Sequence, residues 1–163
     1  MSNIGAAFLL PIVLAAMPLM ASGADAQTVA IYEATIGETD QKTPEVSTTQ
    51  MQEILADGSA IVVDTRPPAE FANGHIPGAQ NLKVAPAEAV AAVDRLAGGD
   101  KAKVLVLYCN GPFCQASRRM SDQLVAAGFT NVRRYQLGMP IWRALGGPTE
   151  SLIEKELSDI SRL

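Results

Sequence analysis

Short apolar runs alternate along this chain with longer segments in which apolar residues recur about once per helical turn. The clearest run, residues 104–108, is bounded by glycine and proline and predicts a buried strand of a parallel sheet. An amphipathic helix is predicted after it, with an apolar face formed by Ala116, Met120, Leu124 and Ala127. Residues 104–128 therefore predict a strand, a loop that begins at Cys109, and a helix.

The rest of the chain repeats this alternation. Three further strands are predicted, at residues 60–64, 79–82 and 131–137, the last of them less buried than the clearest run. Further helices are predicted at residues 49–58, 68–71, 86–97, 141–145 and 152–160. Because strands alternate with helices, the sequence predicts an α/β fold with a central, mainly parallel sheet and helices on both faces. The functional edge of such a sheet is the carboxyl end of its strands, which is where Cys109 is placed.

Individual residues add detail to three of these helices. Thr49 and Gln52 have the spacing of a capping box and are expected to open the helix at 49–58. Trp142 is expected to pack in the core. The helix at 86–97 is expected to present to the core a face made of Val90, Val93 and Leu96.

The first 26 residues predict an export signal. Residues 4–20 carry no charged side chain, and Ala24-Asp25-Ala26 offers a small-x-small cleavage site before Gln27. An uncleaved membrane anchor is the alternative, but this run of 17 residues is broken by Pro11 and Pro18 and is short for a spanning helix. The protein is therefore expected to be periplasmic or secreted. The expected regions are a signal peptide at 1–26, an N-terminal arm at 27–43, a folded domain at 44–149 and a C-terminal helix at 150–163.

Composition and charge argue against several classes of partner. The formal net charge is −4, and removal of residues 1–26 takes away only Asp25, which leaves −3 from 13 basic and 16 acidic residues. Such mild acidity gives no electrostatic basis for binding nucleic acid or, beyond the export signal, a membrane. No metal or other cofactor is predicted, because two cysteines and the lone His75 supply too few ligands for a common zinc pattern.

Both cysteines of the chain lie on the loop between the predicted strand and helix. A thiolate at Cys109 would be stabilised there by backbone N–H groups and by the positive end of the following helix, which favours its use as a nucleophile. The alternatives are a buried structural cysteine or a structural Cys109–Cys114 disulfide. Since the two thiols are so close in the sequence of an exported protein, a bond between them would be a redox state of the site.

Three stretches of the sequence resemble the signatures of one family. They comprise residues 62–66 with 70–71 and 74–81, residues 107–109 with the helix that follows, and residues 138–148. Together they resemble a single-domain rhodanese, a sulfurtransferase module, of the subgroup with a Cys-x-Gly-Pro-x-Cys loop. The resemblance implies that Cys109 takes a sulfane sulfur from a small donor as a persulfide and passes it to a thiol acceptor or cyanide. It also implies an active-site loop formed by Asn110, Gly111, Pro112, Phe113, Cys114 and Gln115.

Several residues around the loop are assigned supporting roles. Asp64 and Arg66 follow a predicted strand and are expected to brace the loop through an ion pair with Glu70. Arg118 and Arg119 lie at the start of the predicted helix, and one of them, with Arg118 as the first candidate, is expected to attract an anionic donor. His75 is expected to orient its turn by hydrogen bonding rather than to act as a base. The loop itself lacks basic residues, so the sequence leaves the donor open.

Cys114 admits more than one role. It is expected to attack the Cys109 persulfide as a resolving thiol, to protect Cys109 from over-oxidation, or to be a small apolar residue at the helix start. A competing hypothesis is a thiol redox switch or binding module that uses the Cys109/Cys114 pair without taking up sulfur. A phosphatase or arsenate reductase is disfavoured, because that chemistry needs an arginine six positions after the cysteine, where Gln115 stands.

Overall fold

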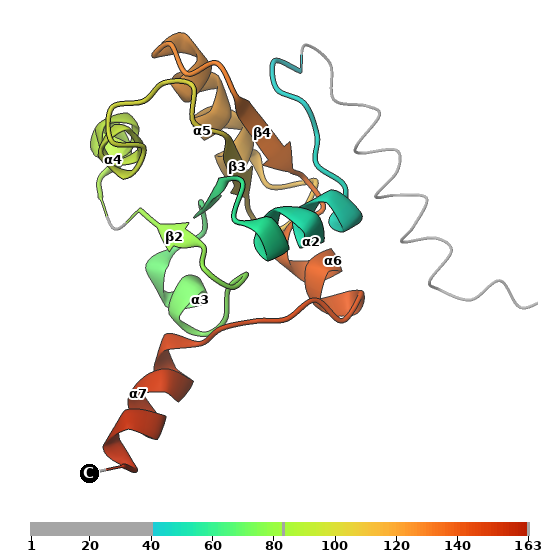
Figure 1. The fold of residues 1–163 in the computed structure, drawn as a ribbon, viewed down its shortest axis with the longest axis vertical. Coiled ribbons are helices and arrows are strands. Elements are labelled where there is room, and N and C mark those ends of the chain that lie inside the picture. Colours follow the sequence, from blue (N-terminus) through green and yellow to red (C-terminus); the bar gives the residue numbers. More distant parts are fainter. Residues whose placement is uncertain (1–40, 83, 163) are drawn as a thin grey trace, which may run out of the picture.

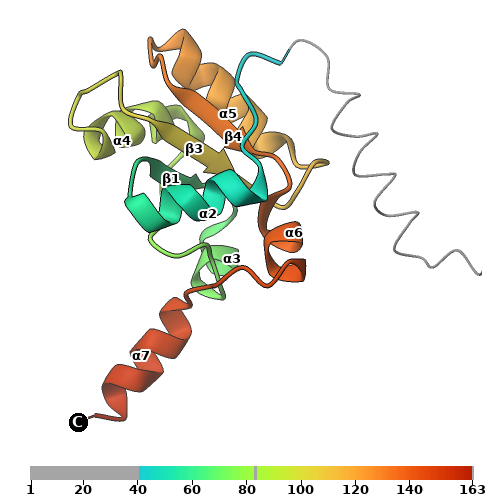
Figure 2. The same ribbon diagram turned by 45° about the vertical axis from the view of Figure 1, so that its right-hand side comes forward.

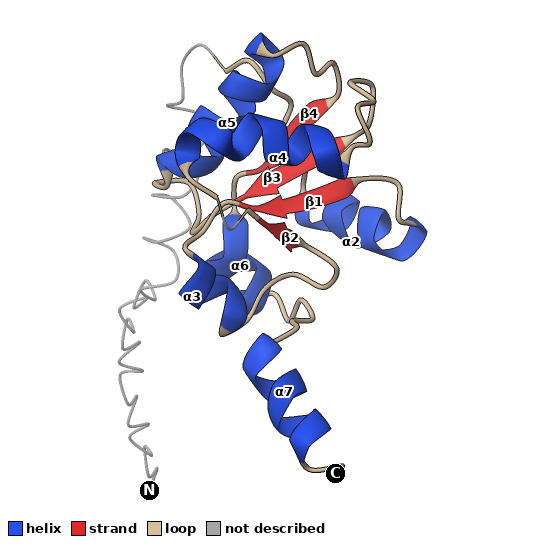
Figure 3. Ribbon diagram, turned by 90° about the vertical axis from the view of Figure 1, so that its left-hand side faces the viewer, coloured by secondary structure: helices blue, strands red, loops and turns tan. Residues whose placement is uncertain are grey.

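Four short parallel strands form the centre of the molecule. The structure, a computed structural model, describes residues 41–82 and 84–162. The strands are β1 (Ile61–Asp64), β2 (Gln80–Asn81), β3 (Leu105–Tyr108) and β4 (Val132–Tyr135). They lie in the order β2-β1-β3-β4 (Figure 3), so β1 and β3 occupy the middle of the sheet. All three pairings are parallel, which confirms the predicted sheet.

Helices cover both faces of this sheet (Figure 3). The helices of the described chain are α2 (Thr48–Asp57), α3 (Pro68–Ala72), α4 (Ala89–Leu96), α5 (Gln115–Ala126), α6 (Gly138–Ala144) and α7 (Leu152–Ile160), with a 3₁₀ turn η1 (Pro86–Glu88). One core joins α2, α3 and α6 to the sheet through buried side chains that include Met51, Phe71, Val106, Tyr108 and Trp142. A second core joins α4 and α5 to the other face through Val93, Leu105, Leu107, Met120 and Leu124. The α/β fold class is therefore confirmed.

Alternate residues of the middle strands serve these two cores. Val62 belongs to the first core and its neighbour Val63 to the second. Successive side chains of a strand point to opposite faces, so a strand that is buried on both faces is apolar throughout. This explains the uninterrupted apolar run of β3, whose four residues are all buried. In β4 the side chain of Arg133 is exposed, so this strand is less buried, as predicted.

The cap of α2 differs from the prediction. Ser47, not Thr49, is the N-cap: its hydroxyl accepts from the Gln50 N–H, and the Gln50 side chain accepts from the Ser47 N–H at 2.9 Å. The capping box is thus shifted by two residues. The cause is tertiary, because Val46 donates its N–H to the Arg134 carbonyl at 2.7 Å and holds the chain extended up to Ser47.

This cap leads to a prediction about stability. Replacing Ser47 with Ala is expected to lower the free energy of unfolding by about 1 kcal/mol, because the first turn of α2 loses an acceptor for an orphan N–H group. Thr49→Ala is the matched control, since this exposed residue lies inside the helix, and a change of only a few tenths is expected. Urea unfolding of both variants measures the difference. An equal cost for the two would show that the cap contributes nothing.

Two predicted helical faces are only partly right. The predicted helix at 86–97 begins as the 3₁₀ turn η1, and in α4 the buried residues are Ala89, Ala92 and Val93, whereas Leu96 is 41% exposed. In α5 Met120 and Leu124 are buried as predicted, but they are accompanied by Ser117 and Ser121. Small alanine and serine side chains let a helix pack close to its neighbour. They are therefore buried at positions that hydrophobic spacing alone does not predict.

The two ends of the described chain differ in how they contact the domain. Next to β4, Glu45 forms an ion pair with Arg134 at 2.8 Å, and Thr43, from the predicted arm, is buried. At the other end, α7 occupies the predicted residues and projects from the domain (Figures 1 and 2), with no buried side chain. The predicted export signal and residues 27–40 of the arm lie outside the described residues. Among the helices formed by residues 41–82 and 84–162, none has the length and apolarity needed to cross a membrane.

Candidate active site

Cys109 directly follows β3 at the carboxyl edge of the sheet. Its neighbour Tyr108 pairs in register with Asp64, the last residue of β1, so the ends of the two middle strands meet beside the cysteine. Thr65 closes this junction, because both its N–H (3.0 Å) and its hydroxyl (2.8 Å) donate to the Tyr108 carbonyl. Cys109 is only 3% exposed. The topology thus places this thiol group at the edge where parallel α/β sheets bind ligands.

The loop after Cys109 turns tightly into α5. Gly111 has φ +99°, and its carbonyl accepts from the Cys114 N–H at 3.0 Å. Cys114 is the N-cap of α5 and is half-buried; its side chain makes no capping hydrogen bond. A disulfide joins Cys109 to Cys114, with their Cα atoms 6.2 Å apart. The structure therefore shows the site in its oxidised state, one of the states the sequence left open.

The other loop residues differ in exposure. Phe113 is 70% exposed at the surface of the loop, Asn110 and Gln115 are exposed, and Pro112 is half-buried. Gln115 is the first residue of α5. Phe113 thus leaves a large apolar side chain in solvent beside Cys114.

Gly138 packs directly against the backbone of the loop, a contact that was not predicted from the sequence. Met139, the next residue, donates its N–H to the Cys109 carbonyl at 2.9 Å. Gly138 has φ +62°, and a Cβ atom there would collide with the Cys109 carbonyl oxygen and the Gly111 nitrogen. Its place in a signature stretch was visible in the sequence. The contact with the loop was not, because the two segments meet only in the folded chain.

This close approach predicts the effect of a single methyl group. Gly138→Ala is expected to displace the loop and to lower any activity of Cys109 at least about tenfold, since misplaced reacting groups lose much of their rate. Gly58→Ala is the matched control, because Gly58 has φ +65° but open space around it. Activity of both variants relative to the unaltered protein is the measurement. If Gly58→Ala lost as much activity as Gly138→Ala, backbone strain rather than loop contact would be responsible.

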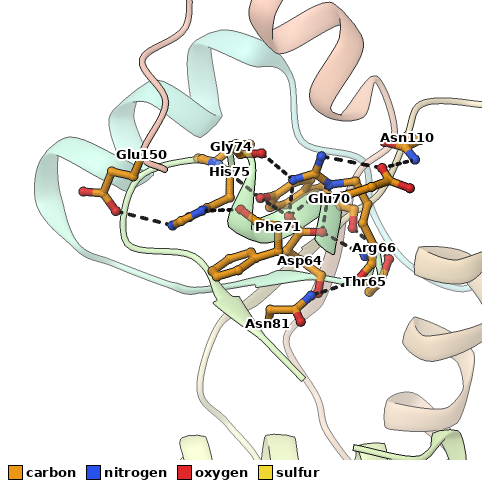
Figure 4. Close-up of polar contacts among 12 residues, drawn as sticks. Asp64, Thr65, Arg66, Glu70, Phe71, Gly74, His75, Asn81, Asn110 and Glu150 are labelled. Carbon is orange, nitrogen blue, oxygen red and sulfur yellow. Dashed lines mark hydrogen bonds and ion pairs between the residues drawn. The ribbon is translucent and has the colours of Figure 1, made fainter. Parts of the chain in front are cut away.

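A buried polar network lies under the loop (Figure 4). Asp64 is 0% exposed and accepts from the Arg66 guanidinium at 2.6 Å and from the Tyr108 hydroxyl at 2.6 Å. Burial and the negative charge of Asp64 raise the pKa of Tyr108 well above its usual range, so this hydroxyl stays a hydrogen-bond donor. Burial lowers the pKa of Arg66, but the hydrogen bonds and charge of Asp64 outweigh it and raise this pKa overall.

Glu70 connects this network to the loop. Its carboxylate lies 3.8 Å from the Arg66 guanidinium and accepts from the Asn110 side chain at 2.7 Å. Figure 4 shows Asn110 and Glu70 at one end of the network and His75 with Glu150 at the other. The predicted Arg66–Glu70 ion pair is present, and Asp64 and Arg66 are connected to the loop through Glu70. The Glu70–Asn110 bond, which completes the connection, was not foreseen, because both residues are ordinary polar side chains in the sequence.

His75 lies in contacts that stabilise its turn. Its Nδ1 atom is 2.8 Å from the Phe71 carbonyl, and its ring stacks on that of Phe71 with centroids 3.7 Å apart. Its backbone pairs with Glu150 in an antiparallel bridge. Trp142 is fully buried, as predicted, and donates to the Pro148 carbonyl at 2.7 Å.

Two cavities lie near the loop, one at its start and one beside the first turn of α5, which follows it. One, of about 300 Å³, is lined by Arg66, Glu70, Asn73, Asn110, Met139, Pro140 and Arg143. The other, of about 250 Å³, lies between the end of β1 and the helices α4 and α5, and its lining includes Thr65, Ala116 and Arg119. Of the two arginines expected at the start of this helix, Arg119 lines the second cavity. Within residues 41–82 and 84–162, no three His, Cys, Asp or Glu side chains gather in a group able to hold a metal ion.

The fold and the loop together define a parallel α/β domain with a cysteine site at the carboxyl edge of its sheet. The chain belongs to the rhodanese-like domain family, whose match covers residues 47–145. It is 35% identical over 95 residues to thiosulfate sulfurtransferase GlpE of Pseudomonas putida F1, covering 58% of this chain and 80% of that protein. This membership supports sulfurtransferase activity at the level of the family.

Other relatives mark the limits of that likeness. The HTH-type transcriptional regulator Rv0324 of Mycobacterium tuberculosis is 36% identical over 93 residues, covering 57% of this chain but 38% of the regulator. The human single-domain sulfurtransferase TSTD1 is similar in structure, with a TM-score of 0.52 and 26% identity, covering 63% of this chain and 96% of that one. Thiosulfate sulfurtransferase from Pseudomonas aeruginosa has a TM-score of 0.58 and 25% identity, covering 72% of this chain and 22% of its own. Since the domain also occurs within a regulator, the activity of this chain must be argued from its site.

Proposed function

We propose that this protein is a sulfurtransferase in which Cys109 carries a sulfane sulfur from a small donor to a thiophilic acceptor. The main support for this proposal is the position of Cys109. It directly follows a buried strand and begins the loop before α5, and its carbonyl accepts a hydrogen bond from the Met139 N–H. N–H groups at the start of a helix favour a negative charge nearby, which is what a thiolate or persulfide presents. The thiosulfate sulfurtransferase relatives support the same reaction class.

The proposed reaction consists of two displacements. In the first, the Cys109 thiolate attacks the sulfane sulfur, the S–S bond of the donor breaks, and the donor remnant leaves with the electron pair as sulfite when the donor is thiosulfate. In the second, an acceptor thiolate or cyanide attacks the outer sulfur of the persulfide and releases the Cys109 thiolate. The disulfide form seen in the structure must first be reduced by a dithiol.

The cavity beside Asn110 is the proposed entrance for the donor. Arg66 and Arg143 contribute positive charge to its wall, and Arg143 is exposed and donates to the Gly74 carbonyl at 3.3 Å. Asp64 and Glu70 together offset the single positive charge of Arg66. The charge left to attract an anionic donor is therefore mainly that of Arg143.

Arg143→Gln is accordingly expected to raise KM for thiosulfate about two- to fivefold while leaving kcat nearly unchanged, because an exposed, screened charge contributes about 0.5–1 kcal/mol. Arg133→Gln, which removes an exposed arginine from β4, is the control and is expected to leave KM unchanged. Thiosulfate titrations at low and at high salt provide the measurement. A fall in kcat without a change in KM would place Arg143 outside donor binding.

The sulfur-transfer proposal is tested by intact mass spectrometry. Reduced protein and its Cys114→Ser variant, freed of reductant, are exposed in turn to thiosulfate, 3-mercaptopyruvate, glutathione persulfide and polysulfide, and then to cyanide. A gain of one sulfur atom by Cys114→Ser that cyanide removes supports the proposal and identifies the donor class. The disulfide favours a second candidate, a thiol redox module. That function predicts that the unaltered protein loses two hydrogens and that Cys114→Ser takes up no sulfur from any donor.

We also propose that the reaction takes place in the periplasm or outside the cell. The support is the apolar, uncharged run at 4–20 followed by Ala24-Asp25-Ala26. N-terminal sequencing of the protein recovered from its native compartment is expected to begin at Gln27. A chain that retains residues 1–26 would favour the uncleaved anchor.

A further inference from the structure

The two cysteines of the loop are placed asymmetrically. Cys109 is 3% exposed, whereas Cys114 is half-buried and adjoins Phe113, which is 70% exposed. A sulfur delivered to Cys109 is therefore sheltered, and Cys114 is the member of the pair that an external thiol can reach more readily. Cys114 also occupies the N-cap position of α5, but its side chain makes no capping hydrogen bond. The positive end of a helix of this length favours a thiolate at this position.

The loop accommodates a bond between the two sulfurs while its anchors are in place. With the disulfide formed, the Cys109 carbonyl accepts from Met139, the Gly111 carbonyl accepts from Cys114, and Asn110 donates to Glu70. The Cα separation of 6.2 Å lies within the range of ordinary disulfides. Cys114 can therefore reach the sulfur of Cys109 within the folded domain, without the ends of the loop detaching.

We propose that Cys114 resolves the Cys109 persulfide and releases the transferred sulfur as sulfide, an inference that rests on the proposed sulfur transfer. The Cys114 thiolate attacks the inner sulfur of the persulfide, which is Sγ of Cys109. The Cys109–Cys114 bond forms, the bond to the outer sulfur breaks, and that sulfur leaves with the electron pair as hydrosulfide. The sulfane sulfur is the oxidant: it is reduced to sulfide while the two thiols are oxidised to the disulfide.

A dithiol then returns the site to its starting state. Two exchange steps at the disulfide, the first at the more accessible Cys114, regenerate both thiols and leave the reductant as a disulfide. Over one cycle the donor loses its sulfane sulfur as sulfide, and the dithiol supplies the two electrons. The protein is thus a dithiol-dependent sulfide-releasing enzyme, in addition to a carrier of sulfur to acceptors.

The experiment compares wild-type protein with Cys114→Ser and Cys114→Ala. Each is reduced, freed of reductant under nitrogen, mixed with one equivalent of donor, and followed by intact mass and by trapping of sulfide with monobromobimane. Wild-type protein is expected to release one sulfide per chain and to end two hydrogens lighter than its reduced form. Both variants are expected to keep a persulfide that decays at least about tenfold more slowly, because an intramolecular thiol attacks far faster than one in solution. Addition of dithiothreitol is expected to give faster sulfide release from wild-type protein than from the variants, in which dithiothreitol itself has to attack the persulfide.

The outcomes separate this inference from the proposed function. If wild-type persulfide is as long-lived as that of Cys114→Ser, and the disulfide forms only with an added oxidant such as diamide, Cys114 does not resolve the persulfide, although sulfur transfer stands. If neither wild-type protein nor the variants take up sulfur from any donor, sulfur transfer fails and this inference with it. Because Cys114→Ser and Cys114→Ala are both measured, a folding defect in one variant is not mistaken for the loss of the resolving thiol.

Discussion

Cys109→Ser is expected to abolish sulfur uptake and to lower thiocyanate formation from thiosulfate and cyanide by at least about 1,000-fold. Serine is a far poorer nucleophile at neutral pH, and no other cysteine follows a strand at the carboxyl edge of the sheet. The remaining thiol, Cys114, lies at the start of α5. Steady-state thiocyanate formation, assayed with reduced protein, measures the effect.

Cys114→Ser is the matched control for this prediction. It removes the second thiol from the same loop and is expected to retain sulfur uptake and discharge to cyanide. A large loss in Cys114→Ser combined with normal uptake in Cys109→Ser would show that the roles of the two cysteines are reversed. Equal retention in both variants would place the reaction elsewhere on the chain.

Arg66→Met is expected to lower the free energy of unfolding by about 3–5 kcal/mol, the largest effect on stability among the substitutions considered. Asp64 is 0% exposed and would be left in the core without its main cationic partner. The Tyr108 hydroxyl, which donates to the same carboxylate, is too weak a partner to compensate for the loss of Arg66. Urea unfolding followed by circular dichroism measures the change.

Two further variants test this explanation of the Arg66 effect. Glu70→Gln removes a half-exposed charge that lies 3.8 Å from Arg66, and it is expected to cost less than about 1 kcal/mol. The double variant Asp64→Asn with Arg66→Met is expected to lose less free energy of unfolding than the sum of the two single variants. Asp64→Asn already leaves Arg66 without its counter-charge, so the additional change Arg66→Met breaks no further ion pair with Asp64. Additive costs would contradict a buried ion pair as the source of the effect.

The sequence was most informative where hydrophobic pattern and fold agree. Strands β1 and β3, the α/β class and the place of Cys109 after β3 all follow from apolar runs that separate amphipathic segments. Burial of Trp142 and the position of α7 were predicted as well. These features depend on residues that lie near one another in the chain.

What the sequence missed depends on contacts between distant segments. The cap of α2 moved to Ser47 because the preceding residues pair with β4. The support of the loop by Gly138 requires α6 to pack under it, and the Glu70–Asn110 hydrogen bond joins residues 40 positions apart. Nor could the sequence decide between thiol and disulfide states of the cysteine pair, because either is compatible with their spacing.

The central claim, that Cys109 carries the transferred sulfur, is tested most directly by locating that sulfur on the chain. Reduced wild-type protein is mixed with thiosulfate, alkylated with iodoacetamide within seconds so that no free thiol can attack the persulfide, and digested with trypsin. The peptide of residues 104–118, which contains both cysteines, is then fragmented in a mass spectrometer. We expect one additional sulfur atom on Cys109. An additional sulfur on Cys114, or a peptide that loses two hydrogens without ever gaining sulfur, would contradict the account.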